Sequence, residues 1–215
     1  MKYKEFNTYS DFENEKRQCR SCTVGLTYNC VVCSDGNKIN PKVVIIGECP
    51  GSTEIEEGKP FVGKAGQLLR SVLKEYNFTR YNSLITNTIP CRPENNKFPS
   101  DDNIVKSCMN TWLKEELRLT NPDFLLLIGA KSVKFLLGLE GITKIRGKWI
   151  HKKFNNKTIN IMPTLHPSYV LRKQYMSEGK EIMEYFKKDI QEVSRMANLT
   201  DCIKEIVKLC EHMDI

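Results

Sequence analysis

The sequence predicts an α/β protein: a three-layer sandwich with a central, mainly parallel four-stranded sheet, plus C-terminal helices. Four short apolar runs rich in β-branched residues are typical of strands buried on both faces. They span 42–47, 83–89, 123–128 and 158–162. Segments with helical spacing of apolar residues lie between them, at 66–76, 101–117 and 131–137. Because strands and helices alternate, we expect parallel pairing, with helices covering both faces of the sheet.

Local patterns justify the individual elements. The run at 42–47 is continuous Val and Ile in its middle and ends at Gly47, as expected where a buried strand reaches a turn. The helix at 66–76 carries its large apolar residues on one side, so we expect that face to pack on the sheet. Ser100 stands directly before the helix at 101–117 and is its expected N-cap.

The C-terminal part is expected to be helical from Glu178 onward. A first helix with apolar residues at core spacing closes a domain that spans 1–197. A second helix is expected over the extension 198–215, where apolar residues recur at steps of four and three. They are Leu199, Ile203, Ile206, Cys210 and Met213. Five positions are too few to establish a coiled coil, so we expect packing on the domain. The alternative is a seam for self-pairing or for a protein partner.

Composition and charge narrow the class of protein. The chain has 215 residues, of which 40% are hydrophobic, enough to bury one sizeable core. It has no run of about eighteen apolar residues, and its polar start is unlike a signal peptide, so we expect a cytoplasmic or otherwise intracellular protein. The net charge of +7 favours polyanionic partners, although a solvated lysine-rich surface accounts for it equally well.

Nine cysteines in such a chain are expected to be thiols and metal ligands, not disulfides. Cys19 and Cys22 form a C-x2-C pair, and Cys91 and Cys108 follow far along the chain. A fold that brings these thiols together would hold a metal or an iron–sulfur centre. The alternative is a compact four-thiolate zinc site. Cys30 and Cys33 form a second C-x2-C pair, and the ligands of the zinc site would be the two pairs together, Cys19, Cys22, Cys30 and Cys33.

Three polar or glycine-bearing segments follow the expected strand ends, at 47–51, 87–93 and 165–168. Ligands of parallel sheets bind where the strands end at the carboxyl edge. We therefore expect these segments to meet around one pocket.

Five motifs occur in order along the chain. They are GECPG at 47–51, GKPFVGKAGQLL at 58–69, TNTIPCRPENNKFPS at 86–100, LLLIGAKS at 125–132 and PTLHPSYVLR at 163–172. Together they resemble the iron–sulfur uracil-DNA glycosylases, family 4 of that superfamily, over about residues 16–195. Several separated motifs in one order are much more specific than a single motif. The resemblance implies a monofunctional enzyme that flips uracil out of DNA and hydrolyses its N-glycosidic bond, starting base-excision repair.

We expect uracil binding from Gly47, Cys49, Glu54, Phe61 and Asn87, of which Glu54, Phe61 and Asn87 match base-binding residues of the family. Asn87 matches the asparagine whose amide pairs with the uracil edge and rejects the amino group of cytosine. Phe61 matches the ring that stacks on the flipped base. Glu54 matches the residue that fills the space beside C5 and excludes the thymine methyl group.

We expect catalysis from Glu48, Asn87 and His166, of which Asn87 and His166 match residues of the family. His166 matches the histidine that donates a hydrogen bond to the uracil carbonyl where negative charge develops. Glu48 is expected to hold the attacking water together with backbone groups. Cys49 stands where this family usually has glycine or alanine, and because a neutral thiol is a poor base we interpret it as a small filler.

DNA contacts are expected from Ser168, Tyr169, Leu171 and Arg172, which match a loop that enters the minor groove. Lys64 is expected to contact phosphate, together with other basic residues near the motifs.

The resemblance also implies a structural [4Fe–4S] cluster on Cys19, Cys22, Cys91 and Cys108, which we favour over zinc and which leaves the other C-x2-C pair as bystanders. We expect a monomer that acts on uracil-containing DNA. One alternative is a catalytically weak homologue kept as a DNA-binding or replication-associated subunit, suggested by Cys49 and the C-terminal extension. Another is a zinc-dependent nucleic-acid module.

Overall fold

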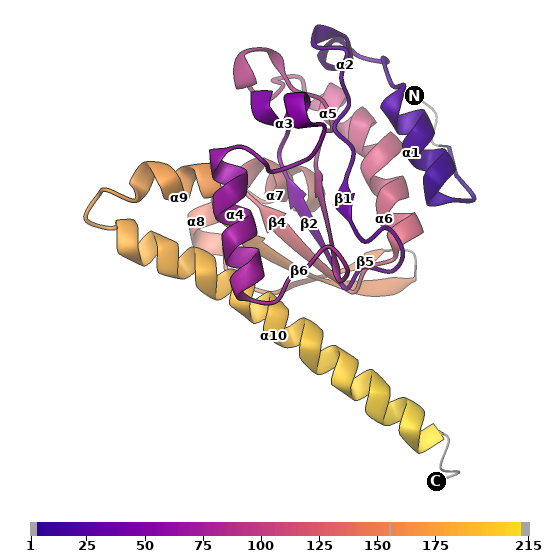
Figure 1. Ribbon diagram of the computed structural model, residues 1–215, viewed down its shortest axis with the longest axis vertical. Coiled ribbons are helices and arrows are strands. Elements are labelled where there is room, and N and C mark those ends of the chain that lie inside the picture. The colour runs from indigo at the N-terminus through magenta and orange to yellow at the C-terminus, as the bar shows by residue number, and fades with distance from the viewer. Residues whose placement is uncertain (1–3, 155, 212–215) are drawn as a thin grey trace.

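Six strands form one sheet in the computed structural model, which describes residues 4–154 and 156–211, with side chains described up to 205 (Figure 1). The order across the sheet is β1-β3-β2-β4-β6-β5. The strands are β1 (Asp35–Gly36), β2 (Val43–Gly47), β3 (Ser83–Asn87), β4 (Phe124–Ile128), β5 (Ile150–Phe154) and β6 (Lys157–Thr164). The four inner strands pair in parallel, and each edge strand runs antiparallel to its neighbour.

The predicted α/β class and mainly parallel sheet are confirmed, but the predicted count of four strands is wrong. Neither edge strand carries a strand signal in the sequence. β1 has two residues, one of them glycine, and offers no apolar run. β5 carries exposed His151, Lys152 and Lys153 in its middle. Charged residues protect an exposed sheet edge from pairing with other chains, and they also remove the apolar pattern that marks a strand.

Three helices cover one face of the sheet: α4 (Lys64–Glu75), α9 (Pro167–Lys173) and α10 (Gly179–Glu211). Figure 1 shows all three on the same side of the strands. Val43 and Ile45 of β2 point to this face and pack against apolar side chains of all three helices. The face of the helix predicted at 66–76 therefore packs on the sheet, as expected from its pattern.

The other face is covered by α5 (Asp102–Cys108), a π-helical segment (Met109–Leu113), α6 (Lys114–Thr120) and α7 (Ala130–Leu137). Val44 and Ile46, the alternate residues of β2, pack here, so the sandwich has the predicted three layers. Asp101, and not the predicted Ser100, caps α5, because its carboxylate accepts a hydrogen bond from the backbone N–H of Asn103 at 2.9 Å. Both residue types are good N-caps, and aspartate occupies the position next to the helix.

One continuous helix, α10, replaces the two predicted C-terminal helices. Neither glycine nor proline occurs between Gly179 and its end, and Ala197, at the predicted boundary between domain and extension, is a strong helix former. Figure 1 shows the C-terminal part of α10 projecting beyond the sheet. Within the described residues, no helix combines the length and apolar character needed to cross a membrane.

The first turns of the predicted extension are tied to the domain by ion pairs. Lys42 pairs with Asp201, and Asp123 pairs with Lys204. Leu199 and Ile203 are exposed on this part of the helix. The side chains of the remaining predicted apolar positions, Ile206, Cys210 and Met213, lie outside the described ones.

The N-terminal arm contains α1 (Tyr9–Arg17) and α2 (Thr23–Thr27), and α1 lies beside α6 (Figure 1). Phe12 is fully buried and packs against Trp112. Nearby, Lys16 Nζ lies 3.1 Å from Glu116 Oε2 in a fully buried ion pair. These contacts anchor the arm on the helical layer. Three short helices complete the fold: α3 (Ser52–Glu57), η1 (Glu94–Asn96) and α8 (Ile142–Ile145).

Candidate active site and metal centre

The carboxyl ends of β2 and β3 bring two predicted site residues together. In the parallel register Gly47 is the partner of Asn87. Thr88 fixes the two strand ends, because its backbone N–H and its hydroxyl both donate to the Gly47 carbonyl, at 2.9 and 2.7 Å. β6 ends at Thr164 on the same edge, two residues before His166. The three segments expected to form a pocket therefore meet at one edge of the sheet.

Gly47, Phe61 and Asn87 pack closely together, around the place that a side chain at position 47 would occupy. A Cβ atom added to Gly47 would lie 2.4 Å from Phe61 Cζ and 2.5 Å from Asn87 Oδ1, both far too close. The rings of Phe61 and His166 lie beside each other, with centroids 6.2 Å apart and planes inclined by 36°. Glycine is required at position 47, because any side chain there would collide with both neighbours.

Asn87 is 6% exposed, and its Oδ1 atom has no hydrogen-bond partner among the described residues. Buried polar atoms are nearly always hydrogen-bonded, and an unpaired one destabilises the fold. Here the unpaired oxygen lies beside Gly47. A ligand that donates a hydrogen bond in this position would satisfy it.

Glu54 holds the backbone of this region. Its Oε1 atom accepts hydrogen bonds from the N–H groups of Val62 and Gly63 at 2.9 and 2.8 Å, and its Oε2 atom accepts one from Gly51 at 3.0 Å. Both carboxylate oxygens are thus engaged with backbone. Glu54 therefore holds the backbone of Gly51, Val62 and Gly63 in place. Its exclusion of the thymine methyl group stays a prediction.

His166 is the N-cap of α9. Its Nδ1 atom accepts a hydrogen bond from the Ser168 backbone N–H at 3.2 Å and lies 2.7 Å from the Ser168 hydroxyl. Burial lowers the pKa of His166 below its ordinary value, and the charge of Arg172 lowers it further, whereas those of Glu48 and Glu54 act in the opposite direction. A neutral imidazole whose Nδ1 accepts must carry its proton on Nε2, which makes Nε2 a donor.

Glu48 lies at the start of α7, beside His166. Its Oε1 atom accepts a hydrogen bond from the Lys131 backbone N–H at 3.0 Å. Gly129, with a φ of +94°, lets the carboxylate approach, because an added Cβ would lie 2.5 Å from Glu48 Oε1 and 3.1 Å from His166 Cβ. The start of a helix favours negative charge, so the carboxylate is held in a stabilising field.

Cys49 is mostly buried and packs against the apolar layer on the α5–α7 side of the sheet. Burial, aided by the charges of Glu48 and Glu54, raises the pKa of this thiol to about 12. The thiol is therefore protonated at neutral pH and is neither a base nor a nucleophile. This supports the interpretation of Cys49 as a filler.

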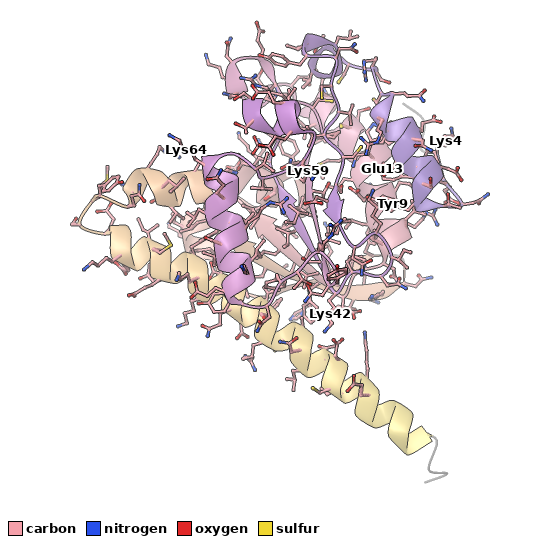
Figure 2. All side chains as sticks on the ribbon, viewed as in Figure 1. Lys4, Tyr9, Glu13, Lys42, Lys59 and Lys64 are labelled. Carbon is pink, nitrogen blue, oxygen red and sulfur yellow. The ribbon has the colours of Figure 1, made fainter. Side chains whose placement is uncertain are left out.

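The residues expected in a DNA-inserting loop lie in a helix, α9, so that part of the prediction is wrong. Pro167 at the start of the segment fixes a backbone angle suited to a first helical turn, which favours helix over loop. Ser168, Tyr169 and Leu171 are partly buried and Arg172 is exposed. Lys64 is exposed in the first turn of α4 (Figure 2).

The connection that follows α9 exposes two large side chains, Tyr175 at 92% and Met176 at 52%. The sequence analysis did not single them out, and nothing but their exposure distinguishes them.

The four predicted cluster thiols come from two distant parts of the chain, and all are free cysteines. Burial, followed by the charges of the Cys19 and Cys22 thiolates, raises the pKa of Cys91 to about 12, and burial together with Cys91 raises that of Cys108. Cys19 packs in the same apolar cluster as Cys91 and in a second one with Cys108. Within the described part of the chain, no three cysteine, histidine, aspartate or glutamate side chains are grouped tightly enough to hold a metal ion.

Cys30 and Cys33 lie in the same region. Cys33 packs with Cys91 and Val31, and the charge on Cys30 contributes to the raised pKa of Cys91. Cys30 and Cys33, which we expect to be bystanders, therefore lie next to the predicted cluster ligands.

Arg70 and Thr88 position the site but were not among its predicted residues. Thr88 joins the two strand ends, and Arg70 donates hydrogen bonds to the Phe61 and Pro60 carbonyls. Each binds main-chain atoms, and such contacts leave no residue pattern in the sequence.

Comparison with known proteins shows which proteins this chain resembles. The family model of the Uracil DNA glycosylase superfamily matches residues 33–191, which leaves Cys19 and Cys22 outside the match. The Type-4 uracil-DNA glycosylase of Thermotoga maritima is 32% identical over 177 residues, which cover 80% of this chain and 88% of that protein.

Two archaeal relatives are similar to the same extent. The Type-4 uracil-DNA glycosylase of Sulfurisphaera tokodaii is 32% identical over 188 residues, covering 85% of this chain and 83% of that protein. That of Saccharolobus solfataricus is 34% identical over 164 residues, covering 74% of each chain. The protein therefore belongs to the uracil DNA glycosylase superfamily and, within it, to the type-4 uracil-DNA glycosylases.

Proposed function

We propose that this protein is a monofunctional uracil-DNA glycosylase, which flips uracil out of DNA and hydrolyses the bond between N1 of the base and C1′ of the sugar. A water oxygen bonds to C1′ as the N1–C1′ bond breaks and the bonding electrons leave with the base as the uracil anion. The proton that the water releases to solvent is balanced by protonation of that anion at N1. The products are free uracil and an abasic site, which starts base-excision repair. The observation that carries this proposal is the buried, unpaired Asn87 Oδ1 beside Gly47 and Phe61.

Asn87 supplies base recognition. Its Oδ1 accepts from the N3–H of uracil, and its amide N–H₂ donates to the neighbouring O4. Cytosine has an unprotonated N3 and an amino group at these positions, so it would leave the buried amide unpaired, which discriminates strongly. Phe61 offers the face on which the flipped base stacks, and stacking of this kind is worth roughly 1–3 kcal/mol.

His166 supplies electrostatic stabilisation. As the bond breaks, negative charge moves onto the uracil ring, and the Nε2–H of a neutral imidazole donates a hydrogen bond to the O2 that receives it. A donor already oriented by Ser168 needs no reorganisation during the reaction. Glu48, fixed at the start of α7 through one oxygen, is placed to hold the attacking water with the other.

Cys19, Cys22, Cys91 and Cys108 are the free cysteines that would hold a [4Fe–4S] cluster, and Cys19 packs in the same apolar clusters as Cys91 and Cys108. When bound, the cluster would supply a covalent link between the N-terminal arm and the chain after β3. The thiols would have to lose their protons to bind it. The reaction described above uses no electron transfer, so we assign the cluster a structural role.

The substrate in this proposal is uracil-containing DNA, bound by a monomer. Arg172 and Lys64 are exposed cations in the last turn of α9 and at the start of α4, where they would contact phosphates. Because each such contact releases bound counterions, affinity for DNA should fall steeply as salt concentration rises.

The test is release of uracil from an oligonucleotide that contains one uracil, followed by alkali to cleave the abasic strand. Matched oligonucleotides with cytosine or thymine in the same position are the controls. We expect cleavage of the uracil strand only. DNA binding without cleavage would favour the alternative, a catalytically weak homologue that serves as a DNA-binding or replication-associated subunit.

A further inference from the structure

Phe61 has an unusual backbone conformation. Its φ is +55°, in the left-handed region, and every other described non-glycine residue with positive φ is an asparagine. Left-handed backbone is unfavourable for a phenylalanine, and such strain persists only where surrounding contacts impose it. The ring this backbone carries lies against Gly47. Contacts that impose the conformation therefore also set the position of the ring.

Arg70 makes the contacts that fit this requirement. Its Nε atom donates to the Phe61 carbonyl at 2.9 Å, and its Nη2 atom donates to the Pro60 carbonyl at 2.8 Å. The same Nη2 also donates to Asp35 Oδ2 at 2.7 Å. A planar guanidinium can serve three acceptors in one fixed geometry, which a lysine ammonium cannot reproduce.

Two further contacts hold the same turn. The Glu54 carboxylate accepts hydrogen bonds from Val62 and Gly63, the residues directly after Phe61. On the other side, a Cβ added to Gly66 would lie 2.0 to 2.4 Å from the Phe61 backbone, so α4 presses directly against it. Arg70 and Glu54 thus fix the backbone before and after the ring.

Asp35 connects Arg70 to the N-terminal arm. It belongs to β1, the edge strand at the end of the N-terminal arm, whose register places Asp35 opposite Ile85 of β3. The neighbouring residue Ser34 donates to Thr86 Oγ1 at 2.7 Å, directly before Asn87 in the chain. Ser34 and Asp35 therefore contact Thr86, which precedes Asn87, and Arg70, which holds the Phe61 backbone.

We propose that Arg70, oriented by Asp35, is a positioning residue that holds Phe61 in its left-handed conformation as the platform for the flipped base, and that it joins the N-terminal arm to the pocket. This inference rests on the proposed function, because a platform for a flipped base has a purpose only in a protein that flips bases. Arg70 does not touch the base in this arrangement. It acts through the Phe61 backbone.

A second role for the same residue must be distinguished. The Arg70 side chain is 35% exposed, so a direct contact with DNA phosphate is the competing explanation. Arg70→Lys separates the two roles, because lysine keeps the charge for phosphate but loses the fork that holds the two carbonyls. Asp35→Asn separates them again, because it removes a negative charge and so cannot weaken a phosphate contact.

The experiment compares Arg70→Lys, Arg70→Gln and Asp35→Asn in the full chain, with Arg195→Gln as control. Arg195 is an exposed arginine of α10 that pairs with Glu192. For each protein we would measure KM and kcat on the single-uracil oligonucleotide, inhibition by free uracil, and the salt dependence of DNA binding. Hydrogen exchange of the Val62 and Gly63 amides reports on the turn itself.

We expect both Arg70 variants to weaken inhibition by free uracil and to lower kcat/KM by about tenfold or more. Asp35→Asn should change both in the same direction, and the salt dependence of binding should stay unchanged in all three. The Val62 and Gly63 amides should exchange faster in these variants but not in the control.

Full activity of Arg70→Lys would overturn the proposal, and so would a salt slope in Arg70→Gln that is reduced by about one, the sign of a lost phosphate contact. If Arg70→Gln does not fold, the lysine and asparagine variants decide. The exchange measurement needs no substrate, so it tests the support of Phe61 even if the wild-type protein releases no uracil.

Discussion

The backbone N–H of Ser168 donates a hydrogen bond to His166 Nδ1 at 3.2 Å. Arg172 donates to the Ser168 hydroxyl oxygen at 3.3 Å, which turns the hydroxyl proton toward the same nitrogen, 2.7 Å away. Both Ser168 groups therefore favour an imidazole whose proton lies on Nε2. This relation between His166 and Ser168, two positions apart in the chain, fixes which histidine nitrogen faces a ligand as donor.

His166→Ala should lower the single-turnover rate of uracil release by about 10²–10³, the usual effect of removing one oriented donor to a developing oxyanion. Ser168→Ala keeps the backbone donor and should cost less than about tenfold. Quenched-flow or manual quench with excess enzyme measures the chemical step without product release. A His166→Ala enzyme within tenfold of wild type would remove the histidine from the proposed mechanism.

The buried histidine should also make stability depend on pH. Burial lowers the pKa of His166 below 6.5, so below that pH the unfolded chain binds a proton more readily than the native protein. The free energy of unfolding should then fall as pH drops from about 6.5 toward the lower native pKa, and this contribution should be absent above about pH 7.

Urea denaturation at several pH values between 5 and 8 measures the effect. His166→Gln should flatten the dependence, whereas His151→Gln, which changes an exposed residue of β5, should leave it as in wild type. An identical slope in wild type and His166→Gln would show that this histidine does not titrate as its burial requires.

Most of the fold could be predicted because buried parallel strands carry dense apolar runs. β2 and β4 are buried at every position, and their continuous apolar runs are visible without any structure. β5 and β1 lie at the sheet edges, where exposed charges or a single glycine replace that pattern. The continuity of α10 through Ala197 was hidden for another reason, since apolar spacing alone does not show whether two patterned segments are joined.

The candidate site was predictable where side chains carry the chemistry. Asn87, Phe61 and His166 stand in motifs, and the structure brings them to one edge of the sheet. Contacts through main-chain atoms could not be predicted in the same way. Glu54 binds three backbone N–H groups and Arg70 binds two carbonyls, and such contacts depend on the folded path of the chain alone.

Asn87→Val should separate stability from function. The unpaired Oδ1 is a cost in the free protein, so replacing the amide with an apolar side chain of similar volume should leave the free energy of unfolding unchanged or raise it by up to about 1 kcal/mol. Uracil release should nevertheless be lost. Chemical denaturation and the oligonucleotide assay on one preparation test both parts, and a loss of several kcal/mol would mean that the amide is satisfied in the free protein.

Cys49→Ala should retain uracil release within a few-fold of wild type, because a thiol with a pKa of about 12 is protonated at neutral pH. Because its thiol is protonated, Cys49 should also resist alkylation. Mass spectrometry after brief iodoacetamide treatment should find Cys202, which is exposed, modified well before Cys49. Rapid labelling of Cys49, or an inactive alanine variant, would contradict its assignment as a filler.

Removal of one predicted cluster ligand should change the protein's colour and metal content. The wild-type protein, purified without oxygen, should show broad visible absorption and about four irons per chain, as a [4Fe–4S] cluster requires. Cys91→Ser should lose both, whereas Cys30→Ser with Cys33→Ser, the matched pair beside the same thiols, should keep them. A colourless wild-type protein with one zinc, lost in the Cys30 and Cys33 variant, would instead identify the four-thiolate zinc site.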